Sequence, residues 1–345
     1  MKKSRYVYAV KLILIFCFII MAGCAGKSKK VTLFRHSGGE LVYPAPPDVA
    51  RIKFLYSIQE DRKQNTQATA ARAEFDQRFF LRPYSLYLDT AEHLYVVDQG
   101  LQNVVIVNLK ENSIELLDRN EDIFLNPISV TIDNVHRIYV TDAGGWIAIF
   151  NAAGKFEKMF EPSEKISRPA GIAFNKINQL LYIIDVAEHK VKIFDVNGKL
   201  VKAIGAQGGK EGEFNYPTHI ALDADGNFYV TDTLNFRIQK FSPGGEFMKL
   251  FGSLGDSVGH FSKPKGIAID TEGNIYIVDS YFDNIQLFNN EGRILMAFGN
   301  SGTKMGEFWL PAGIYISDDN RIFIADTYNS RVQVFQLIQA GSTGN

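Results

Sequence analysis

The sequence is dominated by one repeat, in which a proline opens a segment and an aspartate closes a hydrophobic stretch fifteen or sixteen residues later. The pair occurs six times, and successive prolines are 42 to 48 residues apart. Its members are Pro83 and Asp98, Pro127 and Asp142, Pro169 and Asp185, Pro217 and Asp232, Pro264 and Asp279, and Pro311 and Asp326. A period in this range indicates an array of similar supersecondary units.

The fifth repeat, residues 264–299, shows what one unit contains. Four short runs of β-branched and aromatic residues are separated by clusters of Gly, Asn, Asp and Ser, which is typical of strands joined by tight turns. We expect these strands at residues 267–269, 275–278, 285–288 and 294–298. Six units of four strands predict an all-β, six-bladed β-propeller. The strands of a blade are called a, b, c and d from the axis outwards.

The last repeat is one strand short, since only residues 313–316, 322–325 and 332–335 have the composition of strands. Residues 51–58, which precede the first repeat, alternate like an outer strand. An unfinished blade would expose unpaired backbone groups along its edge. We therefore predict that residues 51–58 pair with residues 332–335 and close the ring.

The recurring residues are interpreted as scaffold. An aspartate at the end of strand b can accept hydrogen bonds from the N–H groups of the adjoining turn. One such residue in every blade is a requirement of the fold, so the six aspartates are not read as a catalytic or calcium-binding set. A bulky residue three positions before each proline is expected to wedge between neighbouring blades. These wedges are Phe80, Phe124, Ile166, Phe214, Phe261 and Phe308.

The combined pattern P-x-G-I-A-x-D, N-I-Y-V-x-D, N-x-R-I-Q-x-F and G-x-F-x-x-P resembles the NHL repeat, and it extends over residues 83–336. Repeats four to six match it best. Its third-strand residues are Asn235, Arg237, Gln239 and Phe241 in the fourth repeat, and Asn329, Arg331, Gln333 and Phe335 in the sixth. Repeats one and two depart from it with Ser85 and Ser129 in place of glycine. The resemblance implies a six-bladed propeller. It does not imply one function, because NHL-type propellers serve protein binding, RNA binding and lyase chemistry.

The N-terminus is predicted to be a targeting segment. Four basic residues precede an apolar run at residues 12–21, which is too short to span a bilayer, and Met-Ala-Gly-Cys24 follows. This arrangement resembles a bacterial lipobox with Met where Leu is usual. It predicts a lipoprotein signal peptide at residues 1–23 and lipidation of Cys24, while an ordinary secretory signal or a buried cysteine remain alternatives. Ala25, in the position after the cysteine, favours a bacterial envelope protein anchored in the outer membrane and facing the periplasm.

The expected organisation is lipidated Cys24 and a tether over residues 24–50, a propeller over residues 51–338, and a disordered tail over residues 339–345. The whole chain has a formal net charge of −1, and residues 1–23 contain four basic and no acidic residues. The mature chain therefore carries a charge of −5. Because nucleic acids are bound by basic surfaces, nucleic acid is not an expected partner. We expect a monomeric propeller attached to the membrane through Cys24.

The candidate site lies where the d–a and b–c loops meet, at the end of the channel here called the proline mouth. Residues that begin strand a and residues of the b–c loops are expected to line it. The candidate ligand-binding residues are Tyr84, Trp146, His219, Lys265, Tyr281 and Tyr328. Aromatic side chains give a large contact area at low entropic cost. His219 is the clearest departure from the repeat, because its position is glycine in three other blades.

These features predict a non-enzymatic binding module for a protein, peptide or glycan, with no catalytic residue. Two alternatives remain open: a metal-dependent lyase or lactonase that uses the mouth around His219, and a structural component of an envelope assembly. A zinc site requires three or four ligands. Only His189 is expected to reach the same mouth as His219, so no metal ligand and no cofactor is predicted, with calcium or zinc in the channel left open.

Overall fold

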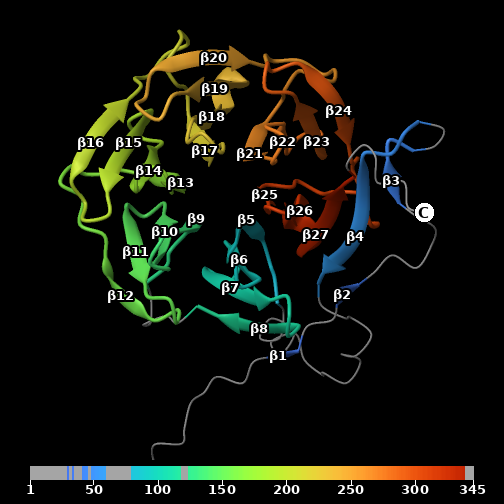
Figure 1. Cartoon of the computed structure of the whole chain (residues 1–345), viewed down its shortest axis with the longest axis horizontal. Helices are drawn as coiled ribbons and strands as arrows, with labels where there is room; N and C mark the ends of the chain where they lie inside the picture. The colour runs from blue at the N-terminus through green and yellow to red at the C-terminus, as the bar shows by residue number, and fades with distance from the viewer. Residues whose placement is uncertain are drawn as a thin grey trace, which may run out of the picture.

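The computed structural model describes residues 29–30, 33–34, 41–45, 48–59, 79–117 and 123–338. Six antiparallel sheets surround a central axis as the blades of a propeller (Figure 1), which confirms the expected fold class. Two short 3-10 helices, η2 at Thr233–Asn235 and η3 at Thr327–Asn329, follow strand b in blades 4 and 6. The predicted signal peptide, Cys24 and the predicted tail lie outside the described residues. In the part of the chain that the structure describes, no helix is long and apolar enough to cross a membrane.

Each of the first five blades contains four consecutive strands, and strand a begins at the repeat proline. Blade 1 contains β5 Pro83–Leu88, β6 His93–Asp98, β7 Asn103–Asn108 and β8 Ser113–Leu116. Blade 2 contains β9 Pro127–Ile132, β10 Ile138–Asp142, β11 Trp146–Phe150 and β12 Phe156–Met159. Blade 3 contains β13 Pro169–Asn175, β14 Leu180–Asp185, β15 Lys190–Asp195 and β16 Leu200–Ile204. Blade 4 contains β17 Pro217–Leu222, β18 Phe228–Asp232, β19 Arg237–Phe241 and β20 Phe247–Phe251. Blade 5 contains β21 Pro264–Ile269, β22 Ile275–Asp279, β23 Asn284–Phe288 and β24 Ile294–Phe298.

Blade 6 is completed by the N-terminal strand, as the sequence predicts. Its inner strands are β25 Ile314–Ile316, β26 Arg321–Asp326 and β27 Arg331–Leu337, and β4 Ile52–Ile58 is the fourth. The register places Ile58 opposite Val332 and Ile52 opposite Leu337. Figure 1 shows the blue β4 beside the red β27 at the outer side of this blade. The two ends of the propeller are thereby joined in one sheet, and the edge of β27 is paired.

Part of the segment expected to be a tether also packs on the propeller. The strand β3, Val42–Tyr43, pairs with β4, and the Tyr43 hydroxyl donates a hydrogen bond to the carbonyl oxygen of Gly306 over 3.2 Å. The Tyr43 ring lies 5.5 Å from the Phe298 ring. Two further short strands, β1 Lys29–Lys30 and β2 Leu33–Phe34, pair with β8 and β4. These contacts could not be predicted from the sequence, because each strand has only two residues.

The proline-to-aspartate rhythm has a direct structural cause. In blade 1, Pro83 lies opposite Asp98, whose carboxylate accepts hydrogen bonds from the backbone N–H groups of Leu81 and Gly100 over 2.8 Å each. In all six blades this aspartate accepts from the N–H group two positions before the proline. Each of the six aspartates is 0% exposed. The carboxylates therefore fix the d–a loops, and the prediction that they are scaffold is confirmed.

The aromatic wedges are buried between blades. Phe214, Phe261 and Phe308 are all 0% exposed, and the Phe261 ring lies 5.6 Å from the Phe288 ring of the following blade. The residue that faces this wedge is Gly252, at φ +91°, where an added Cβ would lie 2.4 Å from the Phe261 ring. A side chain at Gly252 would therefore require both a left-handed backbone and a shifted wedge. Phe80, Phe124 and Ile166 are also buried, as expected.

Candidate functional site

A cavity of about 380 Å³ lies on the propeller axis and is lined by strand a of all six blades. Its walls contain apolar side chains such as Ile172, Ile220, Ile267 and Ile314. It also reaches the loops that join strands a and b, including residues 223–226. That end of the channel is here called the a–b mouth, and it is opposite to the proline mouth. A volume of this size is within the range of small-molecule sites.

The six residues expected to form a ring at the start of strand a all line this cavity. They are Ser85, Ser129, Gly171, His219, Gly266 and Gly313. The glycines are required by close packing, since a Cβ on Gly266 would lie 2.5 Å from the carbonyl oxygen of Ala312, and one on Gly313 would lie 2.3 Å from that of Tyr84. The ring thus marks the inner end of a cavity that opens at the a–b mouth, whereas the sequence placed it at the proline mouth.

The side chain of Tyr84 explains this difference, because it closes the axis on the proline side. Tyr84 belongs to blade 1, yet its ring lies 5.7 Å from the imidazole of His219 in blade 4. The Lys265 Nζ of blade 5 lies 5.3 Å from the centre of the same ring. Three of the predicted site residues are therefore brought together, and of these His219 lines the cavity. Burial, followed by the neighbouring Tyr216, raises the pKa of Tyr84 to about 12, so the phenol is neutral.

A chain of hydroxyl groups fixes the tautomer of His219. The Thr233 hydroxyl donates to the carbonyl oxygen of Pro264 over 3.1 Å, so the Thr218 hydroxyl, 2.7 Å away, donates to Thr233. The Thr218 oxygen is then an acceptor for His219 Nδ1, at 2.9 Å. The proton of the neutral imidazole accordingly lies on Nδ1, and Nε2 carries the lone pair.

The Nε2 atom of His219 is buried and has no hydrogen-bond partner among the residues that the structure describes. The residue is only 8% exposed and lines the cavity. Burial, and to a smaller extent the charge of Lys265, lowers the pKa of His219 to about 3. The imidazole is therefore neutral at physiological pH, and its Nε2 is a hydrogen-bond acceptor on a residue that lines the cavity. A buried acceptor without a partner is costly unless a ligand or water satisfies it.

The a–b mouth has an acidic rim. A second hollow of about 470 Å³ adjoins the cavity and shares Tyr87, Lys176, Tyr315 and Asp318 with it. Together the two hollows are lined by more carboxylates than cations. The carboxylates are Asp89, Glu92, Asp133, Asp223, Asp270, Asp318 and Asp319, and the permanent cations are Lys176 and Arg321. Several of these carboxylates are ion-paired, but Asp270 and Asp318 have no ion-pair partner among the described residues.

Sequence reasoning missed this rim, although the sequence carries a signal for it. In four blades an aspartate follows strand a and precedes a tyrosine of strand b by six residues. The pairs are Asp89 and Tyr95, Asp133 and Tyr139, Asp223 and Tyr229, and Asp270 and Tyr276. The Tyr276 hydroxyl donates to Asp270 over 3.1 Å, and the backbone N–H of Asn274 donates over 2.8 Å. This second aspartate holds the a–b turn and leaves its carboxylate beside the cavity.

The remaining predicted residues lie outside the cavity. The Trp146 Nε1 donates to the carbonyl oxygen of Ile123 over 2.9 Å, so this half-buried ring joins a b–c turn to a neighbouring loop. Tyr281 is 67% exposed and Tyr328 is 49% exposed. The Tyr328 ring lies 5.6 Å from that of Trp309. These exposed rings belong to the b–c and d–a loops of blades 5 and 6, on the side of the proline mouth.

The residues needed for a metal centre do not converge. No group of three or more His, Cys, Asp or Glu side chains is placed to hold a metal ion in the described ranges. The other histidine considered with His219 is His189, whose Nδ1 accepts a hydrogen bond from the backbone N–H of Tyr216 over 3.1 Å. His189 is thereby engaged in a loop contact.

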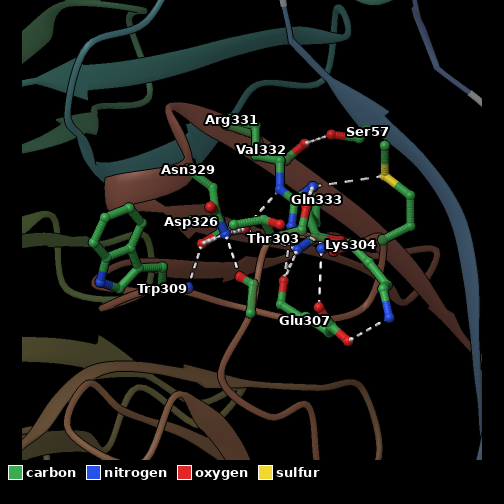
Figure 2. A network of polar contacts seen from close by, with 12 residues as sticks. Ser57, Thr303, Lys304, Glu307, Trp309, Asp326, Asn329, Arg331, Val332 and Gln333 are labelled. Atoms are coloured by element: carbon green, nitrogen blue, oxygen red, sulfur yellow. Dashed lines mark hydrogen bonds and ion pairs between the residues drawn. The ribbon is translucent and has the colours of Figure 1, made fainter.

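The third-strand residues of blades 4 and 6 form equivalent buried networks. In blade 6, the Arg331 Nε lies 2.7 Å from Asp326, and the Arg331 Nη2 donates to the carbonyl oxygen of Glu307 over 2.8 Å (Figure 2). The Gln333 side chain donates to both Asp326 and Glu307. The network of Asp232, Arg237 and Gln239 in blade 4 has the same form. These contacts tie strands b and c to the d–a loop.

The NHL repeat family model matches these two blades, at residues 214–241 and 308–335. A search of the curated proteins finds no match. Among solved structures, the chain is similar to an auxiliary nutrient binding protein from Bacteroides thetaiotaomicron VPI-5482, with a TM-score of 0.61 and 15% identity over 75% of this chain and 70% of that chain. It is also similar to virginiamycin B lyase from Staphylococcus aureus, with a TM-score of 0.55 and 16% identity over 75% and 96%.

A gluconolactonase from Xanthomonas campestris is a further similar structure, with a TM-score of 0.58 and 13% identity over 89% of this chain and 100% of that chain. At these identities the likeness shows the fold alone. The propellers that share the fold include both binding proteins and enzymes. The chain is therefore a six-bladed β-propeller in which blades 4 and 6 match the NHL repeat.

Proposed function

We propose that this protein is a non-enzymatic binding propeller that takes a small ligand into the axial cavity through the a–b mouth. The observation that carries the proposal is the buried Nε2 of His219, an acceptor without a hydrogen-bond partner among the described residues, on a residue that lines the inner end of the cavity. A ligand that donates an N–H or O–H group to this atom would satisfy it. The likeness of the fold to nutrient-binding propellers supports the proposal.

The lining of the cavity limits the chemistry of the ligand. Its walls combine isoleucine side chains with the hydroxyl groups of Ser85, Ser129 and Thr131, and Tyr87 and Tyr315 stand near its mouth. The two tyrosine rings lie 5.3 Å apart. The acidic rim disfavours anions by electrostatic repulsion. An uncharged molecule that carries hydroxyl or amide groups, such as a small glycan or a short peptide, matches this lining.

The test is a binding screen by thermal shift, with neutral mono- and disaccharides and blocked dipeptides as probes. A probe that binds the wild type is expected to bind His219→Phe about fivefold more weakly, since one buried hydrogen bond is worth about 1 kcal/mol. His260→Phe is the matched control, because His260 lies in a d–a loop outside the cavity. Equal affinity of wild type and His219→Phe, or failure of every probe, would contradict the proposal.

The proposed location is the bacterial envelope, with the propeller anchored to the outer membrane through lipid on Cys24 and facing the periplasm. Two or three acyl chains give stable anchoring that one chain does not. Growth with a clickable palmitate analogue is expected to label the wild type and not Cys24→Ser. The Cys24→Ser protein should move to the soluble fraction after cell lysis. Label on Cys24→Ser, or no label on the wild type, would exclude the anchor.

A further inference from the structure

Among the described residues, four cations gather at the axial end of the proline mouth. Arg82, Arg168 and Lys263 immediately precede the prolines of blades 1, 3 and 5, and Lys265 follows on β21. None of these four side chains forms an ion pair with another residue that the structure describes. The six aspartates that end strand b cannot neutralise them, because all six are 0% exposed and turned into the backbone. The repeat itself thus removes these six acceptors from the surface.

Two of the cations rest on tyrosine rings. The Lys265 Nζ lies 5.3 Å from the centre of the Tyr84 ring, and the Arg168 Cζ lies 5.6 Å from that of Tyr216. Tyr84 is close enough to both Tyr216 and Arg168 to be influenced by their charges. A cation held over a ring keeps its N–H groups free on the side away from the ring. Arg168, Lys265, Tyr84 and Tyr216 are here called the cationic cluster.

The cationic cluster consists of donors. Arg168 and Lys265 have only N–H groups to offer, and the hydroxyls of Tyr84 and Tyr216 form no hydrogen bond with any described residue. Tyr84 and Lys265 are half-buried, so the donors are partly withdrawn from water. Guanidinium, ammonium and phenol groups that converge without an acceptor match the oxygens of an anion.

We propose that the cationic cluster binds an oxyanion, the carboxylate, sulfate or phosphate group of a ligand that approaches the proline mouth. The guanidinium of Arg168 and the ammonium of Lys265 supply the charge, and the two tyrosine hydroxyls donate hydrogen bonds. This site is separate from the axial cavity, because Tyr84, which belongs to the cluster, does not line the cavity and closes the axis on the proline side. The molecule would accordingly hold an uncharged ligand at one end of its axis and an anionic group at the other.

The state of Lys265 provides a readout specific to this site. Burial, followed by the charge of Lys263, lowers the pKa of Lys265 to about 8. The groups around its ammonium are Lys263, Tyr84 and His219, none of which is anionic at neutral pH. An anion bound beside Lys265 favours the charged ammonium and raises its pKa. Binding at pH 8 must therefore take up protons, close to half a proton per site at most.

The first experiment measures the melting temperature at pH 8 with sodium sulfate or sodium succinate against sodium chloride of equal ionic strength. Sulfate stands in for phosphate and sulfate esters, and succinate stands in for carboxylates. We expect one or both to stabilise the wild type and Lys265→Arg, and to lose the effect in Lys265→Met and Arg168→Met. The control is Lys199→Met, which removes a charge from an exposed c–d turn at the other end of the blades. Stabilisation by sulfate would indicate a ligand with a sulfate or phosphate group, and stabilisation by succinate would indicate a ligand with a carboxylate.

The second experiment titrates the stabilising anion into the protein by calorimetry at pH 8, in two buffers of different ionisation enthalpy. Wild type and Lys199→Met should take up protons on binding, whereas Lys265→Arg should bind without uptake, because its guanidinium is always charged. The proposal is overturned if neither anion stabilises the wild type beyond chloride. It is also overturned if all variants respond equally, or if binding in the wild type leaves the proton count unchanged.

Discussion

The two ends of the propeller axis are built from the same repeat but present opposite chemistry. At both ends an aspartate accepts hydrogen bonds from the N–H groups of a loop, Asp326 at the proline mouth and Asp270 at the a–b mouth. Asp326 is 0% exposed and paired with Arg331, whereas Asp270 lines the cavity and pairs with no cation among the described residues. Among the described residues, the axial end of the proline mouth presents cations without ion-pair partners, whereas the a–b mouth presents more carboxylates than cations.

This contrast shows where the individuality of a repeat protein lies. The conserved geometry of the blade determines which loops share a mouth, and its aspartates hold those loops in place. The residues between the repeated positions then determine the charge of each mouth. Arg82, Arg168 and Lys263 occupy the position before a proline, which has no fixed identity in the repeat. The difference in charge between the two mouths therefore comes from positions that differ from blade to blade, on a backbone that the six blades share.

The largest expected effect distinguishes the two aspartates. Asp326→Ala leaves Arg331, 3% exposed, as a buried charge without its partner, so we expect a loss of about 3–5 kcal/mol in the free energy of unfolding. Asp270→Ala removes hydrogen bonds from uncharged donors to the carboxylate and leaves no buried cation unpaired, so it should cost about 2 kcal/mol. Urea denaturation of both variants at pH 7 measures the difference. If Asp270→Ala lowered the free energy of unfolding more than Asp326→Ala, the aspartates of the a–b turns would contribute more to stability than those of the d–a loops.

The second effect concerns the boundary between the mouths, at His219. Its pKa is about 3 in the folded protein and 6.5 in the unfolded chain. Because the unfolded state binds the proton more readily, stability falls as the pH decreases from about 6.5 towards 3. Between pH 7 and pH 5 the wild type should lose about 2 kcal/mol more than His219→Gln. Urea denaturation at both pH values checks this. Parallel pH profiles for the two proteins would mean that the imidazole binds a proton as readily in the folded protein as in the unfolded chain.

The architecture of the blades could be predicted from the sequence, because the residues that determine it recur in every repeat. The proline-to-aspartate spacing, the wedges such as Phe261, and the missing strand supplied by residues 51–58 are set by local composition or by repetition. The candidate site was predictable only in part. Position 219 stood out because imidazole replaced glycine, yet the end at which its cavity opens depends on the Tyr84 side chain. That side chain crosses the axis to reach blades four and five, a long-range contact that a one-dimensional pattern does not carry.

A smaller effect tests the hydroxyl relay that orients His219. Thr218→Val keeps the shape of the side chain but removes the acceptor for Nδ1–H, so we expect a loss of about 1 kcal/mol. Nitrogen chemical shifts of the imidazole report the tautomer directly. The wild type should show a protonated Nδ1 and an unprotonated Nε2, and Thr218→Val should show a mixture of tautomers. A wild type with its proton on Nε2 would remove the acceptor from the cavity.

The smallest expected effect tests whether burial or repulsion by Lys263 is the larger cause of the lowered pKa of Lys265. Lys263 is exposed, so Lys263→Met should change the free energy of unfolding by no more than about 0.5 kcal/mol. Because burial is the larger cause, the pKa of Lys265 should rise only slightly from about 8 and stay below its ordinary value of 10.5. Carbon NMR of reductively methylated lysines measures it, with Lys265→Arg to assign the signal. If the pKa of Lys265 returned fully to 10.5 in Lys263→Met, repulsion by Lys263 alone would lower it. Any surface loop with two neighbouring lysines would then show the same shift.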